Sequence, residues 1–248
     1  MLPTFSIGPL VFPTAPLLLI IGAWLGLWLL EWAAQRLGLN REVTYNLGVV
    51  GLLSGFVGAR LAFVLLYWES YQGNWLGMIW PLHTGYLPLM GVIIGGLGLF
   101  FYGRFHQLPL LATLDALVAA LIVALMAVSL ADWLGWGGFG TVTAVPWAIT
   151  QFGLQRHPVQ LYELLGGLLA LLIWWQWLGH RRFAGQLFLV TTAVYSASRL
   201  FVEAFRDDAI LTSDGYRLIQ LISLFVLLSC LYALRQLTDD SELSTINS

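Results

Sequence analysis

The sequence predicts an all-α integral membrane protein with about seven transmembrane helices. Hydrophobic residues make up 59% of the 248 residues and charged residues only 10%, whereas a soluble domain carries about 25% charged residues. Apolar runs of roughly 20 residues, the length needed to cross a bilayer, recur along the chain. No polar stretch is longer than the connections between these runs. We therefore expect one polytopic membrane domain over residues 1–235.

Each predicted helix is an apolar run bounded by turn-like or charged residues. The runs lie at about residues 15–31, 46–67, 87–103, 108–130, 160–179, 186–205 and 216–235. Residues 236–248 are uniformly polar, and we expect them to form a disordered cytoplasmic tail.

The arginines predict the orientation, because basic residues gather on the cytoplasmic side of membrane proteins. One set of connections, together with the C-terminal end, holds Arg36, Arg41, Arg104, Arg181, Arg182 and Arg235. The opposite set holds Arg156, Arg206 and Arg217. We therefore expect the N-terminus outside and the C-terminus in the cytoplasm.

Two connections on the predicted outer side are long and aromatic. Residues 68–86 carry several tryptophans and tyrosines, and residues 131–159 are rich in aromatic residues and glycine. This composition is typical of amphipathic segments at the level of the lipid headgroups, and an ordinary aromatic belt is the alternative. The length of 131–159 favours a functional segment, because structureless loops of this size are uncommon.

Four ionisable residues lie inside predicted helices, where an unpaired charge is costly. They are Arg60, Asp115, Arg199 and Glu203. Arg199 and Glu203 are four residues apart and share a helix face, which Arg206 extends toward the outer end. This stripe keeps one surplus positive charge, and Arg60 adds another. Because guanidinium groups bind phosphate in bidentate fashion, we predict a phospholipid headgroup site; a mutually neutralised structural pair is the alternative.

A polar cluster begins the fifth predicted helix. It contains His157, Gln160, Tyr162 and Glu163, with a proline near the first turn, where its missing N–H is tolerated. Gln160 and Glu163 fall on one side near the helix N-terminus, where the helix dipole favours a carboxylate. A lone histidine at this place is usually a structural cap, but four polar residues within seven positions indicate a site.

These motifs resemble those of the prolipoprotein diacylglyceryl transferase family, and the resemblance covers nearly the whole chain. The strongest matches are RHPVQLYE at 156–163, preceded by PWA at 146–148, and GQLF at 185–188, followed by YSASRLFVEAFR at 195–206. The triplet GAR at 58–60 resembles the arginine motif of the family's second helix, and Asp115 matches the aspartate that opens its fourth helix. Seven helices with an outer N-terminus also fit the family's topology.

The resemblance implies an enzyme of the bacterial inner membrane. Such enzymes move the diacylglyceryl group of phosphatidylglycerol onto the lipobox cysteine of a prolipoprotein at the outer face, and glycerol phosphate departs. On this resemblance, the residues that hold and polarise the headgroup are Arg60, Arg199, Glu203 and Arg206. His157, Gln160, Tyr162 and Glu163 would shape the outer mouth of the site. We expect no cofactor and no metal. A nucleic-acid partner is excluded by the net charge of −2 and the lack of a basic stripe.

Several residues depart from the family's pattern. Ala15 stands where the first helix carries a tyrosine, and Met90 stands where the third-helix motif has a histidine. Counting without gaps from Asp115 places Ser129 at the family's arginine and Asp132 at the first asparagine. The candidates left for a catalytic role are His83, His157 and Asp132.

Several functional hypotheses remain open. The first is an active, divergent diacylglyceryl transferase. The second is a non-catalytic relative that keeps a phospholipid-binding cavity and serves as a lipid-binding or interaction subunit of a membrane complex. A different lipid-modifying transferase with the same headgroup site is a third. Intramembrane charges also mark transport pathways, but the sequence shows neither a two-fold repeat nor an interrupted helix pair. Loss of a base and of a charge-stabilising donor favours the non-catalytic hypothesis, because each loss costs about 100-fold or more in rate.

Overall fold

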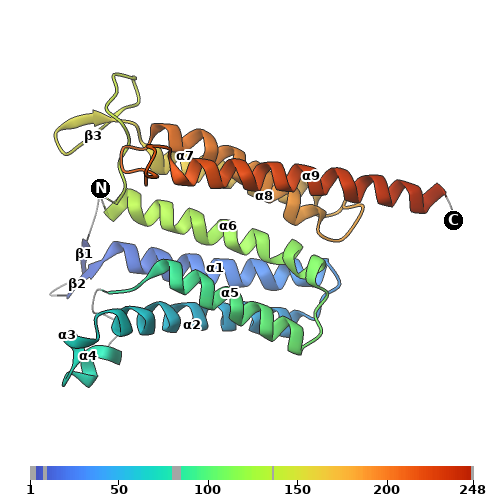
Figure 1. The fold of residues 1–248 in the computed structure, drawn as a ribbon, viewed down its shortest axis with the longest axis horizontal. Helices are drawn as coiled ribbons and strands as arrows, with labels where there is room; N and C mark the ends of the chain where they lie inside the picture. Colours follow the sequence, from blue (N-terminus) through green and yellow to red (C-terminus); the bar gives the residue numbers. More distant parts are fainter. Residues whose placement is uncertain (1–3, 8–9, 80–84, 136, 247–248) are drawn as a thin grey trace. The chain divides into compact units, whose positions relative to one another are not determined.

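A computed structural model describes residues 4–7, 10–79, 85–135 and 137–246. The elements in order are β1 (Thr4–Ile7), β2 (Leu10–Pro13), α1 (Thr14–Arg36), α2 (Arg41–Leu66), α3 (Trp68–Tyr71), α4 (Trp75–Ile79), α5 (Pro88–Phe105), α6 (Leu110–Gly135), β3 (Ile149–Gln151), β4 (Leu154–Arg156), α7 (Val159–Trp177), α8 (Gln186–Val202), the 3₁₀ helix η1 (Glu203–Phe205) and α9 (Leu218–Ile246). Figure 1 shows these elements along the chain.

Seven of the described helices are long and apolar enough to cross a membrane. They are α1, α2, α5, α6, α7, α8 with η1, and the first part of α9, and each coincides with a predicted apolar run. Large apolar side chains on these helices are exposed, such as Val92 at 74% and Phe225 at 72%. A bilayer would cover such surfaces. The chain is therefore an all-α, multi-pass integral membrane protein, as the sequence predicted.

The chain divides into two compact units. The first unit contains residues 1–29 and 114–248, and the second contains residues 30–113. Both units carry membrane-length helices. The expectation of one polytopic domain over 1–235 stays a prediction.

In the second unit, α2 and α5 pack against each other through glycines. A Cβ atom added at Gly95 would lie 2.9 Å from the carbonyl oxygen of Gly51, and one added at Gly55 would lie 3.0 Å from that of Gly91. Small residues allow helix backbones to approach closely in a membrane, where van der Waals packing replaces the hydrophobic effect. These glycines therefore allow the close contact between α2 and α5.

In the first unit, α8 packs against both α7 and α9, and α6 contacts α1 and α7 through glycines. A Cβ at Gly26 of α1 would lie 3.3 Å from the carbonyl oxygen of Ala120, and a Cβ at Gly167 of α7 would lie 2.5 Å from the side chain of Met126. The indole of Trp174, which is 1% exposed, donates a hydrogen bond to the carbonyl of Asp115 at 2.9 Å. These contacts hold the helices that carry the site.

Asp115 fixes the connection between α7 and α8. Its buried carboxylate accepts hydrogen bonds from the backbone N–H groups of Gly185 at 2.8 Å and Phe188 at 2.8 Å, and it pairs with Arg181 at 3.2 Å. Gly185 has a φ of +94°, which favours glycine. The intramembrane aspartate therefore has a structural role: it satisfies the first N–H groups of α8 from a different helix.

Three segments contain helices or strands that the sequence analysis did not predict. Instead of ending near residue 235, α9 continues to Ile246. No glycine or proline interrupts 218–246, and extending an existing helix adds one hydrogen bond for each residue fixed. Residues 68–86 include the short helices α3 and α4, and residues 131–159 include the antiparallel hairpin β3–β4. This hairpin could not be predicted, because its strands of three residues are too short to show an alternating pattern.

Candidate functional site

A cavity of about 370 Å³ lies in the first unit, among α6, α7, α8 and the segment that follows η1. Its polar lining consists of Ser129, Asp132, Glu163, Tyr195, Arg199, Glu203, Arg206 and Asp208. Its apolar lining consists of Leu125, Val128, Ala209, Ile210 and Ile219. The structure thus brings together Arg199, Glu203, Arg206, Glu163 and Asp132 from the set of residues predicted from the sequence.

Glu163 is the centre of the ion-pair network in this cavity. Its carboxylate accepts hydrogen bonds from the guanidinium groups of Arg199 and, at 2.5 Å, Arg206. Arg199 also pairs with Glu203 at 3.2 Å, the spacing of four residues that the sequence predicted. Arg206 holds Asp208 through two bonds, Nε to Oδ1 at 3.0 Å and Nη2 to Oδ2 at 2.8 Å. Each arginine therefore binds two carboxylates.

The expected surplus of positive charge on the Arg199–Glu203–Arg206 stripe is wrong for this cavity. The described lining residues include two arginines and four carboxylates, the latter being Asp132, Glu163, Glu203 and Asp208. The helix stripe taken alone omits Glu163, which reaches Arg199 and Arg206 from α7, and Asp208, which follows η1. A ligand phosphate must therefore compete with carboxylates for the guanidinium groups.

Ser129 and Asp132 occupy α6, one helical turn apart, and both line the cavity. The Ser129 hydroxyl lies 2.8 Å from Oε2 of Glu163, to which it can donate, and 3.2 Å from the carbonyl of Leu125. The Asp132 carboxylate makes no hydrogen bond or ion pair with another described residue. Asp132 is therefore a carboxylate of the cavity that is left available to a ligand.

A glycine-rich loop, residues 137–141, lies before β3 and positions Arg206 at the cavity. The backbone of Thr141 donates to the carbonyl of Phe205 at 2.8 Å, and that of Asp207 donates to Phe139 at 3.0 Å. Gly138 has a φ of +64°, and a Cβ there would meet the Arg206 guanidinium at 2.9 Å. The absence of a side chain at this position leaves room for Arg206.

Gln160 anchors the same loop. The residue is 1% exposed, and its amide nitrogen donates to the carbonyls of Gly137 and Gly138, each at 2.7 Å. Gln151 of β3 donates to Gly138 as well, at 3.1 Å. Gln160 thus contacts the loop that positions Arg206, and its site-shaping role stays a prediction.

Carboxylates stabilise the charge of Arg206, and Arg217 fixes its backbone. Burial lowers the pKa of Arg206, but the hydrogen bond with Asp208 and the negative charges of Glu163 and Asp208 outweigh burial, so the net pKa is raised. The guanidinium of Arg217 donates to the carbonyls of Glu203 and Arg206, each at 2.5 Å. Arg217 therefore fixes the backbone that carries the two charged residues.

His157 and Tyr162 lie together, outside the residues that line the cavity. The Tyr162 hydroxyl accepts a hydrogen bond from the indole of Trp147 at 2.7 Å and lies 3.2 Å from Nδ1 of His157. Because the hydroxyl accepts from Trp147, its own hydrogen can be donated to His157. The His157 ring also contacts Phe205, with ring centroids 4.9 Å apart. These contacts stabilise Phe205, which directly precedes Arg206.

Arg60 belongs to the second unit, where backbone carbonyls satisfy its guanidinium group. It donates to Gly77 at 2.5 Å, Gly85 at 2.8 Å and Met78 at 3.1 Å, and it is 5% exposed. Its charge packs over the ring of Tyr71 at 5.4 Å. Arg60 therefore ties the connection between α2 and α5 together, and its predicted role in headgroup binding stays a prediction.

The remaining sequence-predicted residues are dispersed. Met90 lies in the first turn of α5 in the second unit and is 42% exposed. Ala15 lies in the first turn of α1, 3.8 Å from the position that a Cβ at Gly135 would take. His83 lies outside the described residues.

Sequence reasoning missed Asp208 and Tyr195 as cavity residues. Asp208 follows Arg206 by two residues in the sequence Arg206-Asp207-Asp208. The sequence could therefore have predicted an acidic residue close to Arg206. Asp207 pairs instead with Arg156 at 2.7 Å, on the outside of the loop. The sequence alone could not say which of the two aspartates turns toward the cavity.

The chain is similar to known proteins along most of its length. It matches the family described as prolipoprotein diacylglyceryl transferase over residues 3–235. It is 26% identical to the phosphatidylglycerol–prolipoprotein diacylglyceryl transferase of Clostridioides difficile, over 84% of this chain and 84% of that protein. It is 29% identical to the protein of that name from Finegoldia magna, over 86% of each chain. The corresponding protein of Mycobacterium leprae is 29% identical over 90% of this chain and 76% of its own length. The family match includes every residue that lines the cavity.

Proposed function

Because this chain belongs to the prolipoprotein diacylglyceryl transferase family, we propose that it transfers a diacylglyceryl group from phosphatidylglycerol to the cysteine thiol of a prolipoprotein. Relatives that match most of the chain carry this activity in their names. The corresponding location is the inner membrane of a bacterium, with the cavity toward the outer face. The observation that carries the proposal is a pair of part-buried arginines, Arg199 and Arg206, beside a membrane-helix cavity.

The lining of the cavity supports a phospholipid substrate. Arg199 and Arg206 provide guanidinium groups, which bind phosphate oxygens in bidentate fashion. Leu125, Val128 and Ile219 provide apolar walls suited to the first carbons of acyl chains. Polar and apolar surfaces of this kind match the two ends of a diacylglycerol phosphate.

A phosphate has to replace one carboxylate on these arginines. Asp208 is the natural one to leave, because its side chain is 25% exposed, whereas Glu163 and Glu203 are 7% and 1% exposed. Water can solvate the released Asp208 carboxylate, whereas a buried carboxylate without its partner is destabilised. Arg206 would then bind the phosphate while Glu163 and Glu203 keep Arg199 in place.

The chemistry requires a proton acceptor and stabilisation of the leaving group. The cysteine thiol loses its proton, and its sulfur forms a bond to the glycerol carbon that carries the phosphate. The C–O bond to that phosphate breaks, and glycerol phosphate leaves with the electron pair. Asp132 is the proposed base, because it lines the cavity and is unpaired among the described residues. Arg199 and Arg206 would stabilise the departing phosphate.

A non-catalytic, lipid-binding relative is the second candidate function. It is favoured by the residues that replace those of the family's pattern, since Ser129 bonds Glu163 and does not supply a cation, and Met90 cannot act as a base. Such a chain would keep the lipid cavity and serve as a subunit of a membrane complex.

Complementation separates the two candidates. The full chain is expressed in a bacterium depleted of its own transferase, and insertion in the membrane is verified by immunoblot. Growth contradicts the non-catalytic candidate, whereas failure to grow with normal insertion contradicts the transferase.

A purified assay tests the assigned base. The chain is incubated with phosphatidylglycerol vesicles and a lipobox peptide, and diacylglyceryl peptide is measured by mass spectrometry. We expect Asp132→Asn to lower the rate by about 100-fold or more, the usual contribution of a general base. Asp214→Asn, which changes an exposed aspartate in the turn before α9, is the control. Equal rates for the two variants would rule out Asp132 as the base.

A further inference from the structure

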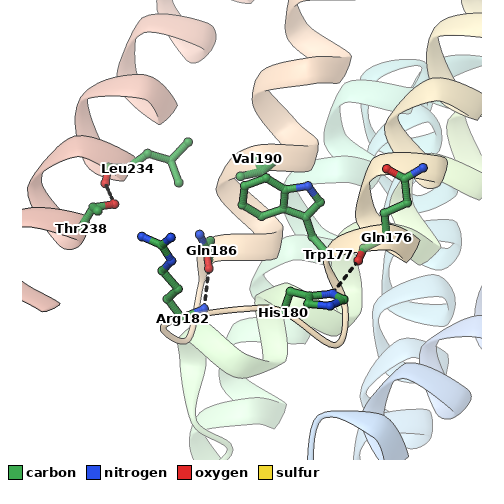
Figure 2. Close-up of a pocket in the computed structure, with 8 residues that line it drawn as sticks. All are labelled: Gln176, Trp177, His180, Arg182, Gln186, Val190, Leu234 and Thr238. Atoms are coloured by element: carbon green, nitrogen blue, oxygen red, sulfur yellow. Dashed lines mark hydrogen bonds between the residues drawn. The ribbon is translucent and has the colours of Figure 1, made fainter. Parts of the chain in front are cut away.

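A second cavity, of about 600 Å³, lies in the first unit at the end opposite the candidate functional site. Its lining comes from α7, the α7–α8 connection, α8 and α9 and consists of Gln176, Trp177, His180, Arg182, Gln186, Val190, Leu234 and Thr238. Figure 2 shows these residues. Gln186 begins α8 and Arg199 follows 13 positions later in the same helix, so about 20 Å of helix separates the two sites.

Arg182 gives this cavity a positive charge that no described lining residue neutralises. No aspartate or glutamate is among the described lining residues, and the Arg182 guanidinium has no ion pair with a described residue. The nearby acid Asp115 is already bound by Arg181 and by two backbone N–H groups. The charge of Arg182 is thus available to an anion.

The amide of Gln186 is oriented with its donor group free. Its Oε1 accepts a hydrogen bond from the backbone N–H of Arg182 at 2.6 Å, and this bond fixes which end of the amide is oxygen. The NH₂ group has no bond to a described residue, although Gln186 is only 6% exposed. Figure 2 shows this hydrogen bond between Gln186 and Arg182 as a dashed line.

His180 also lines the cavity, and Figure 2 shows its ring directed toward Gln176. Its Nδ1 lies 3.1 Å from the carbonyl of Gln176, so Nδ1 carries a hydrogen and donates it. Nε2 makes no bond with a described residue. A cationic donor and an amide donor, with no carboxylate among the described lining residues, form a surface that selects anions.

We propose that this cavity binds the phosphate group of a phosphoester, held by Arg182 and Gln186. Val190 and Leu234 add apolar lining next to these donors, and Trp177 belongs to the residue type that gathers at membrane interfaces. Basic pockets between transmembrane helices bind anionic lipid headgroups. A phospholipid headgroup and a soluble phosphate ester share this chemistry, and the experiment distinguishes them.

Photolabelling tests the proposal at the level of residues. The full chain is reconstituted in phosphatidylcholine nanodiscs that contain phosphatidylglycerol with a diazirine near its glycerol backbone, and labelled peptides are mapped by mass spectrometry. We expect label in 176–190 and in 234–238. We expect Arg182→Gln to reduce that label by about tenfold, the effect of one lost charge-assisted hydrogen bond, and Arg182→Lys to reduce it less. Label at the candidate functional site should not change in these variants.

Arg235→Gln is the matched control, because Arg235 is an exposed arginine of α9 outside the lining of this cavity. It should retain the label within twofold. A second arm adds excess soluble glycerol phosphate: label that persists identifies the lipid as the ligand, and label that disappears identifies a soluble phosphate ester. An absence of label in this cavity, or equal losses in Arg182→Gln and Arg235→Gln, would overturn the proposal.

Discussion

Replacing Glu163 by glutamine tests whether one buried carboxylate holds the candidate site together. The glutamate accepts hydrogen bonds from Arg199, Arg206 and Ser129, and it is 7% exposed. Glutamine has nearly the same shape and keeps an acceptor oxygen, so the substitution removes mainly the charge. Any effect can then be assigned to the lost ion pairs and not to a loss of side-chain packing.

The expected loss of stability follows from the two guanidinium bonds. A hydrogen bond to a charged group contributes about 1.5–3 kcal/mol and a neutral one about 1 kcal/mol, so two weakened bonds cost about 2 kcal/mol. The upper end of the range for charged groups does not apply, because the side chains of Arg199 and Arg206 are 20% and 15% exposed and water screens them in part. A chain of this size loses roughly 2–4 °C of Tm per kcal/mol, which corresponds to a decrease of roughly 4–8 °C.

Thermal unfolding in detergent micelles at one scan rate measures this effect. Glu31→Gln is the matched control, because Glu31 pairs with Arg41 at 2.6 Å with side chains 26% and 62% exposed, and such surface pairs contribute about 0–1 kcal/mol. Glu163→Gln should also retain more anionic phospholipid, since a competing negative charge is gone. A Tm within about 1 °C of the parent chain, or an equal decrease in both variants, would refute the assigned network.

Four further substitutions have expected outcomes. Arg199→Leu should lower the anionic phospholipid that copurifies with the chain, measured by lipid mass spectrometry; unchanged lipid would contradict its role in the site. Asp115→Ala should lower the free energy of unfolding by about 2–4 kcal/mol, because two backbone N–H groups lose their acceptor; near-parental denaturant unfolding would contradict this. Gly95→Ala should destabilise the chain, because the added Cβ meets a backbone carbonyl at 2.9 Å. Gly96→Ala, which meets no atom within 4 Å, should leave Tm unchanged or raise it.

The membrane helices could be predicted from the sequence. Their number and approximate positions follow from runs of apolar residues, because the requirement to cross hydrocarbon acts on each segment separately. Helix ends depend on a more local balance: α9 passes the expected end near residue 235 and continues to Ile246. The motifs at 156–163 and 195–206 also indicated Glu163, Arg199 and Glu203 by residue type and spacing.

The charge balance of the site, by contrast, depends on the tertiary structure. The Arg199–Glu203 pair could be predicted, because a spacing of four residues places both side chains on one helix face. The contacts of Glu163 with Arg199 and of Glu163 with Ser129 join residues 36 and 34 positions apart. Such contacts depend on which faces of α6, α7 and α8 meet, and packing of the whole unit determines those faces. For that physical reason a stripe with surplus positive charge in the sequence became a carboxylate-rich cavity in the folded chain.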